Sequence, residues 1–253
     1  MRILLVNPNI SAGITEAIRR RAESVARPGT AITAATAAFG PAYISTRAEN
    51  AIAAHAMLDA MARAAHASQI DGAVVGAFTD AGLLAARDIF PFPVAGMVEA
   101  GMAAAARGGR RFAVITAAPA LAGVIDGLAA GYGHGDLFAG TLSLDHGAVD
   151  LAGDLRGAVG PLAALAGTAV RTRGAEAVLL GGAPLAPLAQ EIEQAAGIPV
   201  VEGIAAAVRR LEALGPGAGG ERPSRPAGKP CKGLAPELAA AMGLSPLVED
   251  GRS

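Results

Sequence analysis

The sequence predicts an α/β fold made of two similar halves, each built on a doubly wound parallel sheet. Short apolar runs without polar alternation are typical of strands that are covered on both faces, and several such runs occur. They alternate with alanine-rich segments of helical length, which favours parallel strands joined by right-handed crossovers. Two patterns from the first half of the chain also return in the second half.

The elements follow from these runs and from the helix-capping residues between them. Ser11 can cap the first helix, and Ser45 or Thr46 can cap the second, with Glu49 as a capping-box partner. In chain order the prediction is strand Ile3–Val6, helix Ser11–Ala26, strand Ala31–Thr36, helix Arg47–Ala67, strand Ala73–Ala77, helix Leu83–Ile89, strands Val94–Met97 and Phe112–Thr116, helix Ala118–Ala130, strand Leu137–Leu144, helix Leu151–Arg173, strand Ala177–Leu180, helix Leu185–Ala196, strand Pro199–Glu202 and helix Ile204–Leu214.

The repeat pairs the first and third strands of each half. "RILLVNPN" from Arg2 is similar to "RFAVITAAP" from Arg111, and "DGAVVGAFTDAG" from Asp71 is similar to "AEAVLLGGAPLA" from Ala175, about 105 to 109 residues later. If the halves face each other, the turns after these four strands converge on one cleft. We expect residues 1–94 with 203–214 to form one domain and 95–202 the other.

From Gly215 onward the sequence changes in character. "GPGAGGERPSRPAGKPCKG" is rich in glycine and proline and predicts a linker, and "LAPELAAAMGL" after it predicts one short helix. We expect this tail, residues 215–253, to lie outside the core, either mobile or draped over a neighbouring surface.

Composition excludes several classes of function. The 253 residues carry a formal net charge of -1, which gives no reason to expect a nucleic acid or an anionic membrane as a partner. Four histidines and one cysteine, without metal-ligand spacing, predict no metal site and no disulfide within the chain. The first apolar run is too short for a signal peptide, so a cytoplasmic location is expected.

The predicted cleft carries polar side chains that suit a small anion. Asn9 and Ser11 stand at the start of the first helix, where free backbone N–H groups favour a carboxylate. Thr79 and Thr116 add hydroxyl groups at the ends of two further strands. A tight turn in which asparagine satisfies its own backbone explains Asn9 equally well. Tyr43 fits a lid over the cleft and plain packing equally well.

Two carboxylates near these turns are tentative bases. Asp80 directly follows Thr79, and Glu99 stands at a strand-to-helix junction, where burial could raise its pKa. For both residues helix capping is the alternative role, and for Asp80 the helix concerned begins near Ala81.

Taken together, the motifs resemble the aspartate/glutamate/hydantoin racemase superfamily, in its hydantoin and allantoin racemase-like branch. The resemblance rests on "RILLVNPNIS", "GPAYISTRAENAIAAHA", "GAFTDAGLLAARD", "VAGMVEAGMAAAARGGRRFAVIT" and "LLGGAPLAPLAQEIEQAAGIPVVEGIAAAV", and it covers about Met1 to Leu214. It implies two domains with the active site between them, no cofactor, a small carboxylate or ureide substrate and an even-numbered homo-oligomer. It also implies two cysteines that exchange a proton with opposite faces of one carbon.

The sequence departs from this pattern at both cysteines. The resemblance places them at Ala77 and Gly182, which transfer no proton, and it places Phe78 and Ala183 beside the substrate. Cys231, the only cysteine, lies in the tail and matches neither position. Three functions stay open: an unusual racemase or isomerase, a lyase or decarboxylase that uses another base such as Asp80 or Glu99, and a binding protein without catalysis.

Overall fold

Two parallel sheets of four strands each form the framework of the computed structural model, which describes residues 1–145, 154–219 and 228–247. The first sheet has the order β2-β1-β3-β4 and the second the order β6-β5-β7-β8. Because β1 and β5 occupy the same place in their sheets, as do β3 and β7, the predicted repeat and fold class are confirmed. The strands are β1 Arg2–Asn7, β2 Ala31–Thr36, β3 Gly72–Val75, β4 Val94–Gly96, β5 Phe112–Thr116, β6 Phe138–Ser143, β7 Ala177–Gly181 and β8 Val200–Glu202.

Helices connect the strands largely where the sequence predicts them. The helix Met97–Ala105 was not predicted. The expected helix start at Ala118 directly precedes a 3-10 turn, and the expected start at Leu185 lies within another. The expected start at Leu151 lies outside the described residues. The helices are α1 Ala12–Val25, α2 Arg47–Ala67, α3 Leu83–Ile89, α4 Met97–Ala105, α5 Ala122–Gly131, α6 Val159–Arg173, α7 Ala189–Ala196 and α8 Gly203–Leu214, with 3-10 turns η1 Pro119–Leu121, η2 Arg156–Ala158 and η3 Ala183–Leu188.

The repeat extends to the hydrogen bonds at the strand starts. The Arg2 backbone N–H donates to Asp71 Oδ2 at 2.7 Å, and the Asp71 N–H donates to the Arg2 carbonyl oxygen at 2.9 Å. In the second half, the Arg111 N–H donates to Glu176 Oε2 at 2.9 Å, and the Glu176 N–H donates to the Arg111 carbonyl oxygen at 2.7 Å. The same reciprocal pair therefore fixes the neighbouring inner strands of both sheets.

Two helices exchange sheets between the halves. Helix α4 follows the first sheet but contacts β7 and β8, whereas α8 follows the second sheet and contacts β3 and β4. Glycines allow close packing where the helices meet, since a Cβ added at Gly101 of α4 would lie 2.6 Å from Leu179 Cδ1 of β7 and 3.4 Å from the Gly203 Cα of α8. A Cβ at Gly203 would lie within 3.0 Å of the Met97 carbonyl carbon. The predicted division into 1–94 plus 203–214 and 95–202 fits these contacts and stays a prediction.

The hydrophobic core has three parts because strand side chains alternate between faces. Ile3 and Leu5 point into a shared core that also contains Val114 and Leu179 from the second sheet. Leu4 and Val6 point to the opposite face, under α2 and α3. The second sheet has its own outer core under α6 and α7. One core therefore joins the halves on the faces that meet.

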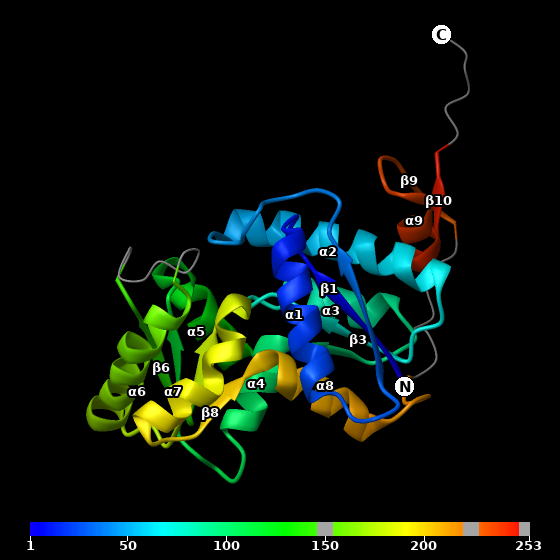
Figure 1. Ribbon diagram of the computed structural model, residues 1–253. Helices are drawn as coiled ribbons and strands as arrows, with labels where there is room; N and C mark the ends of the chain where they lie inside the picture. Colours follow the sequence, from blue (N-terminus) through cyan, green and yellow to red (C-terminus); the bar gives the residue numbers. More distant parts are fainter. Residues whose placement is uncertain (146–153, 220–227, 248–253) are drawn as a thin grey trace.

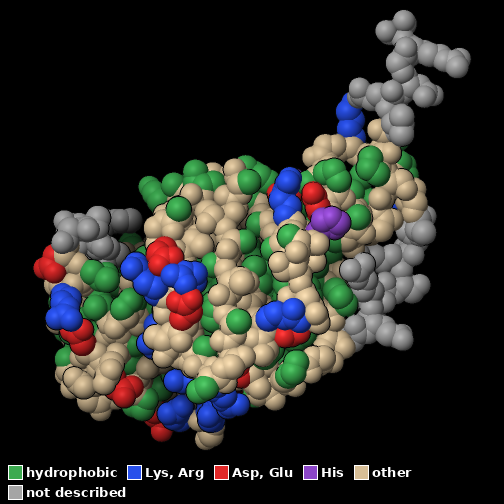
Figure 2. All heavy atoms as spheres, turned by 45° about the vertical axis from the view of Figure 1, so that its right-hand side comes forward, with side chains coloured by type: hydrophobic (Ala, Val, Ile, Leu, Met, Phe, Trp, Pro, Cys, Tyr) green, Lys and Arg blue, Asp and Glu red, His purple; other side chains and the backbone are tan. Residues whose placement is uncertain are grey.

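Part of the tail packs on the first half, with two residues buried against its outer core. Helix α9, Pro236–Met242, forms where a short helix was predicted and contacts α2 (Figure 1), and Leu238 and Ala239 are buried there. Two short parallel strands, β9 Lys229–Cys231 and β10 Leu244–Pro246, flank it. Within the described ranges no helix is long and apolar enough to cross a bilayer. On the face in Figure 2, basic and acidic side chains lie in mixed groups rather than in one field.

Candidate functional site between the two sheets

A cavity of about 250 Å³, here called the central cavity, lies where the carboxyl ends of β1, β3, β5 and β7 meet. This is the end of a parallel sheet where ligands usually bind. It contains most of the predicted site residues, from both halves. Its walls include Asn9, Ile14, Tyr43, Ile44, Ser45, Gly76, Ala77, Phe78, Thr79, Thr116, Ala117, Ala118, Leu121, Gly181, Gly182, Ala183, Pro184 and Leu185.

The turn after β1 is held by a buried asparagine that the sequence did not single out as a site residue. The Asn7 side chain donates to Asn9 Oδ1 at 2.9 Å and to Thr15 Oγ1 at 3.0 Å. Asn9 Oδ1 also accepts the Ser11 N–H at 2.9 Å. Ser11 caps α1 by accepting the Ile14 N–H at 3.3 Å, and it does not line the central cavity. The oxygen of Asn9 is therefore used within the turn.

The corresponding turn in the second half is held by Thr116. Its hydroxyl donates to the Gly181 carbonyl oxygen at 3.1 Å and accepts the Ala118 N–H at 3.1 Å. These bonds tie the end of β5 to the end of β7. The hydroxyl hydrogen of Thr116 is therefore used in a hydrogen bond within the protein. Toward a ligand, this hydroxyl can act only as an acceptor.

Ala77 and Gly182 both line the central cavity, on the turns after β3 and β7. Gly182 has φ +113°, a conformation that a residue with a side chain rarely adopts. Phe78 packs against the other turn, since a Cβ at Gly181 would lie 2.9 Å from Phe78 Cε1. Side-chain packing thus favours glycine at position 181, and the backbone conformation favours it at position 182.

Thr79 is the polar group at this site whose hydrogen bonding is incomplete. Its side chain is 3% exposed, and its hydroxyl has no hydrogen-bond partner among the described residues. A buried polar atom without a partner costs free energy, which a ligand can recover. Tyr43, by contrast, is 69% exposed at the cavity wall. The central cavity therefore presents one free, buried hydroxyl.

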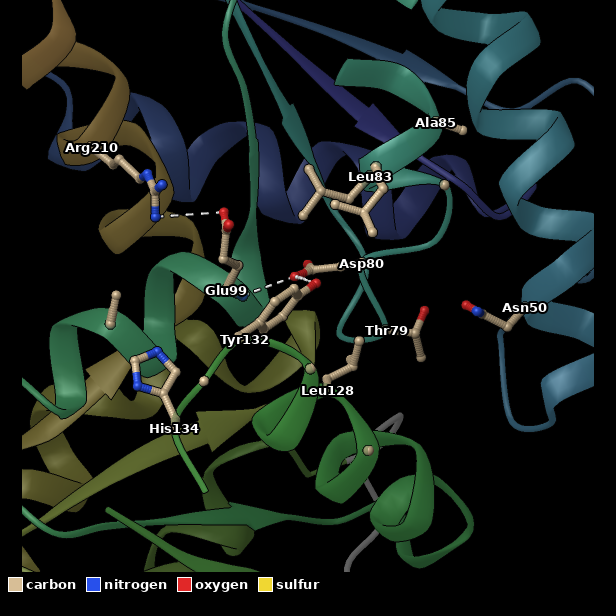
Figure 3. A pocket seen from close by; sticks show the side chains of 16 residues that line it. Asn50, Thr79, Asp80, Leu83, Ala85, Glu99, Leu128, Tyr132, His134 and Arg210 are labelled. Atoms are coloured by element: carbon tan, nitrogen blue, oxygen red, sulfur yellow. Dashed lines mark hydrogen bonds and ion pairs between the residues drawn. The ribbon is translucent and has the colours of Figure 1, made fainter. Parts of the chain in front are cut away.

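The two tentative bases lie outside the central cavity. Asp80 and Glu99 line a second depression of about 920 Å³, here called the lateral groove, which also touches Thr79. In Figure 3, Tyr132 reaches Asp80 from the second half, and Arg210 reaches Glu99. Neither the Asp80 carboxylate nor the Glu99 carboxylate lines the central cavity. The described lining of that cavity contains no Cys, His, Asp, Glu or Lys.

Asp80 caps a helix, but not the adjacent one. Its Oδ1 accepts the Val98 N–H at 3.0 Å, and its Oδ2 accepts the Glu99 N–H at 2.8 Å, both at the start of α4. The Tyr132 hydroxyl donates to Oδ2 at 2.9 Å. Asp80 itself has φ +46°, and the short helix after it begins only at Leu83. The predicted cap near Ala81 is therefore replaced by a cap on a helix 18 residues away.

Burial dominates the electrostatics of this cap. It raises the pKa of Asp80 from 3.8 to about 6, although the Val98 and Glu99 N–H groups and Tyr132 act in the opposite direction. Burial and the nearby Asp80 charge raise the pKa of Tyr132. Glu99 is held by both guanidinium nitrogens of Arg87, at 2.9 and 2.6 Å, and by Arg210 at 3.5 Å.

The raised pKa predicts a pH-dependent stability. The folded state binds the Asp80 proton more tightly than the unfolded chain, so this stabilisation is complete below about pH 4 and is lost as the pH rises through about 6. Between pH 4 and 7, the free energy of unfolding of the wild type should fall by up to about 3 kcal/mol relative to Asp80→Asn. Urea denaturation of both proteins across this range measures the difference, and a constant difference would contradict the assignment.

The chain is similar in sequence and in structure to known racemases. The model of the Asp/Glu/Hydantoin racemase family matches residues 3–211. A hydantoin racemase from Rhizobium meliloti is 34% identical over 214 residues, covering 85% of this chain and 88% of the relative. The structure of an allantoin racemase from Klebsiella pneumoniae has a TM-score of 0.79 at 34% identity, covering 85% of this chain and 87% of its own.

A second group of structures shares the fold alone. Arylmalonate decarboxylase superimposes with a TM-score of 0.60 at 19% identity, covering 89% of this chain and 96% of its own. Two parallel sheets of equal order, with a cavity between their carboxyl ends, define the racemase-type two-domain fold. The chain belongs to the Asp/Glu/hydantoin racemase family.

Proposed function

We propose that the chain binds a small carboxylate or a hydantoin-type ureide in the central cavity, as a member of its family that works without a cofactor and without the two-thiol proton exchange. The observation that carries this proposal is the position of Ala77 and Gly182 in one cavity between the sheets, beside the free hydroxyl of Thr79. Both residues stand where the resemblance places the family cysteines.

Thr79 supplies the main polar contact in this proposal. Its hydroxyl donates to a carboxylate or carbonyl oxygen of the ligand, and Thr116 keeps a lone pair for an N–H of the ligand. Ile14, Phe78 and Leu185 enclose the apolar part of the ligand. An acceptor group and an apolar substituent on one small molecule match a substituted hydantoin.

A decarboxylase-type reaction is the second candidate. The described lining has no carboxylate, thiol, imidazole or amine to remove a proton from carbon, whereas loss of CO₂ generates a carbanion without such a base. The protonation that follows would then need water or Tyr43, the one titratable side chain among the described residues of the wall. Asp80 and Glu99 could take part only if the turn at Thr79 moved.

Binding and proton exchange test the proposal together. Wild type and Thr79→Val are titrated with 5-benzylhydantoin, allantoin and a dicarboxylate, and Thr168→Val, a half-buried position of α6 outside the central cavity, is the control. We expect about three- to tenfold weaker binding for Thr79→Val and no change for the control, because one hydrogen bond is lost.

Deuterium incorporation from solvent at the α-carbon then measures catalysis. We expect no enzymatic exchange above the spontaneous rate, with or without Cys231→Ser. Exchange that survives Cys231→Ser would show that a non-thiol base acts and would exclude a function limited to binding. If none of the three ligand types binds, the assignment of the central cavity is wrong.

A further inference from the structure

Helix α5 carries three glycines that packing does not require. Gly123, Gly127 and Gly131 follow one another at four-residue spacing on one face, and all are exposed. A Cβ added at any of them would meet no atom within 4 Å, and none has a positive φ. Glycine weakens a helix relative to alanine. The face is therefore open to close approach by another molecule at a cost to the helix.

Two of these glycines, Gly127 and Gly131, line the lateral groove, and so do two residues whose side chains have an unpartnered polar atom. The Thr79 hydroxyl and Asn50 Oδ1 are buried without a hydrogen-bond partner in the described part of the chain, and both residues line the groove. Figure 3 shows the Asn50 amide pointing from α2 toward Thr79. The groove thus offers two hydrogen-bonding atoms that no protein group uses.

The charges in the groove are already balanced. Asp80 accepts two backbone N–H groups and the Tyr132 hydroxyl. Glu99 is paired with Arg87 and Arg210. A charged ligand would have to compete with these partners, whereas an uncharged ligand would not.

We propose that the lateral groove is a second ligand site, which takes a small uncharged molecule with a urea- or amide-type N–H donor and an apolar substituent. The N–H groups donate to Asn50 Oδ1 and to a lone pair of Thr79 Oγ1, which are the unpartnered acceptors. The substituent lies on the glycine face of α5, between Leu83 and Leu128.

The two sites share the hydroxyl of Thr79, which lines both. If a ligand oxygen in the central cavity accepts the Thr79 proton, the lone pairs stay free for an N–H donor in the groove. Each ligand then strengthens the binding of the other by the same factor. This coupling rests on the proposed function, but the groove site itself does not.

N-benzylurea is the probe, with benzylamine and benzoate as charged controls, titrated by calorimetry and ligand-observed NMR. We expect the wild type to bind N-benzylurea at least about tenfold more tightly than either control. Gly127→Leu should weaken its binding about tenfold by filling the groove, while Gly123→Leu, on the same helix face but outside the groove lining, should leave it unchanged. Asn50→Ala should weaken it about three- to tenfold.

Folding does not obscure this test, because leucine favours a helix more than glycine and both variants should melt no lower than wild type. Unchanged binding by Gly127→Leu and Asn50→Ala would overturn the proposal. Ala118→Phe fills the central cavity and not the groove. If Ala118→Phe abolished the binding of N-benzylurea and Gly127→Leu left it intact, the proposal would also be overturned. A changed oligomer mass in both leucine variants would identify the glycine face as a subunit contact instead.

Binding of N-benzylurea in the groove that is not affected by 5-benzylhydantoin would count only against the proposed role of Thr79 in the central cavity.

Discussion

Ala77→Cys is expected to create proton-transfer activity on a 5-substituted hydantoin. Ala77 lines the central cavity and is 7% exposed, and the change adds one sulfur atom to an existing Cβ. A single positioned acid or base typically accelerates a reaction about 10²- to 10⁴-fold. We therefore expect solvent deuterium exchange at C5 to rise by about that factor, measured by mass spectrometry in a Cys231→Ser background.

Ala77→Ser is the matched control, because serine has nearly the same size but does not ionise near neutral pH. A folded Ala77→Cys protein that binds the hydantoin yet exchanges no faster than Ala77→Ser would show that position 77 is not beside the reacting carbon. Full racemisation needs a second group, and Gly182→Cys is the designed partner. Its φ of +113° predicts strain of about 1–3 kcal/mol, so the double variant should gain less than two independent thiols would give.

Gly203→Ala is expected to have the largest effect on stability. The added Cβ would contact the Met97 carbonyl group, which is backbone at the start of α4 and cannot move aside as a side chain could. Overpacking of this kind costs about 3 kcal/mol, which corresponds to a melting temperature about 6–12 °C lower in a chain of this size.

Gly13→Ala tests whether this effect is specific to the helix crossing. Gly13 lies in the first turn of α1, is exposed, and a Cβ there would meet only Ser11 Oγ at 3.9 Å. The same substitution should therefore stabilise the protein by roughly 0.5–1 kcal/mol. Calorimetry measures the melting temperatures of Gly203→Ala and Gly13→Ala. Equal melting temperatures would contradict the close contact between α8 and α4.

The sequence is informative where structure depends on local pattern. Unbroken apolar runs such as Ile3–Val6 and Phe112–Thr116 identify strands, and parallel strands place their carboxyl ends together. The turns that follow these strands are therefore expected to converge on one cleft, and Ala77, Thr116 and Gly182 on three of these turns line the central cavity.

The parts that the sequence does not predict depend on contacts between distant segments. Helix α4 contains Gly101, which lowers helix propensity, and only its close approach to Leu179 explains the glycine. Asp80 is a residue type that often caps helices, and it stands just before a helix in the sequence. Its partners Val98 and Glu99 become its neighbours only when β3 and β4 pair. Tyr132 reaches Asp80 from the other half, and no spacing in the sequence signals that contact.

The exchange of α4 and α8 between the sheets has a consequence for biosynthesis. The inner face of the first sheet at β3 and β4 is not covered until α8, Gly203–Leu214, has been synthesised, because α8 packs against these two strands. A nascent chain that ends before α8 thus exposes the inner apolar side chains of β3 and β4, such as Val74 and Ala95. The halves should therefore mature together after release rather than one after the other on the ribosome, and a protein cut near Gly108 should not yield two independently folding fragments.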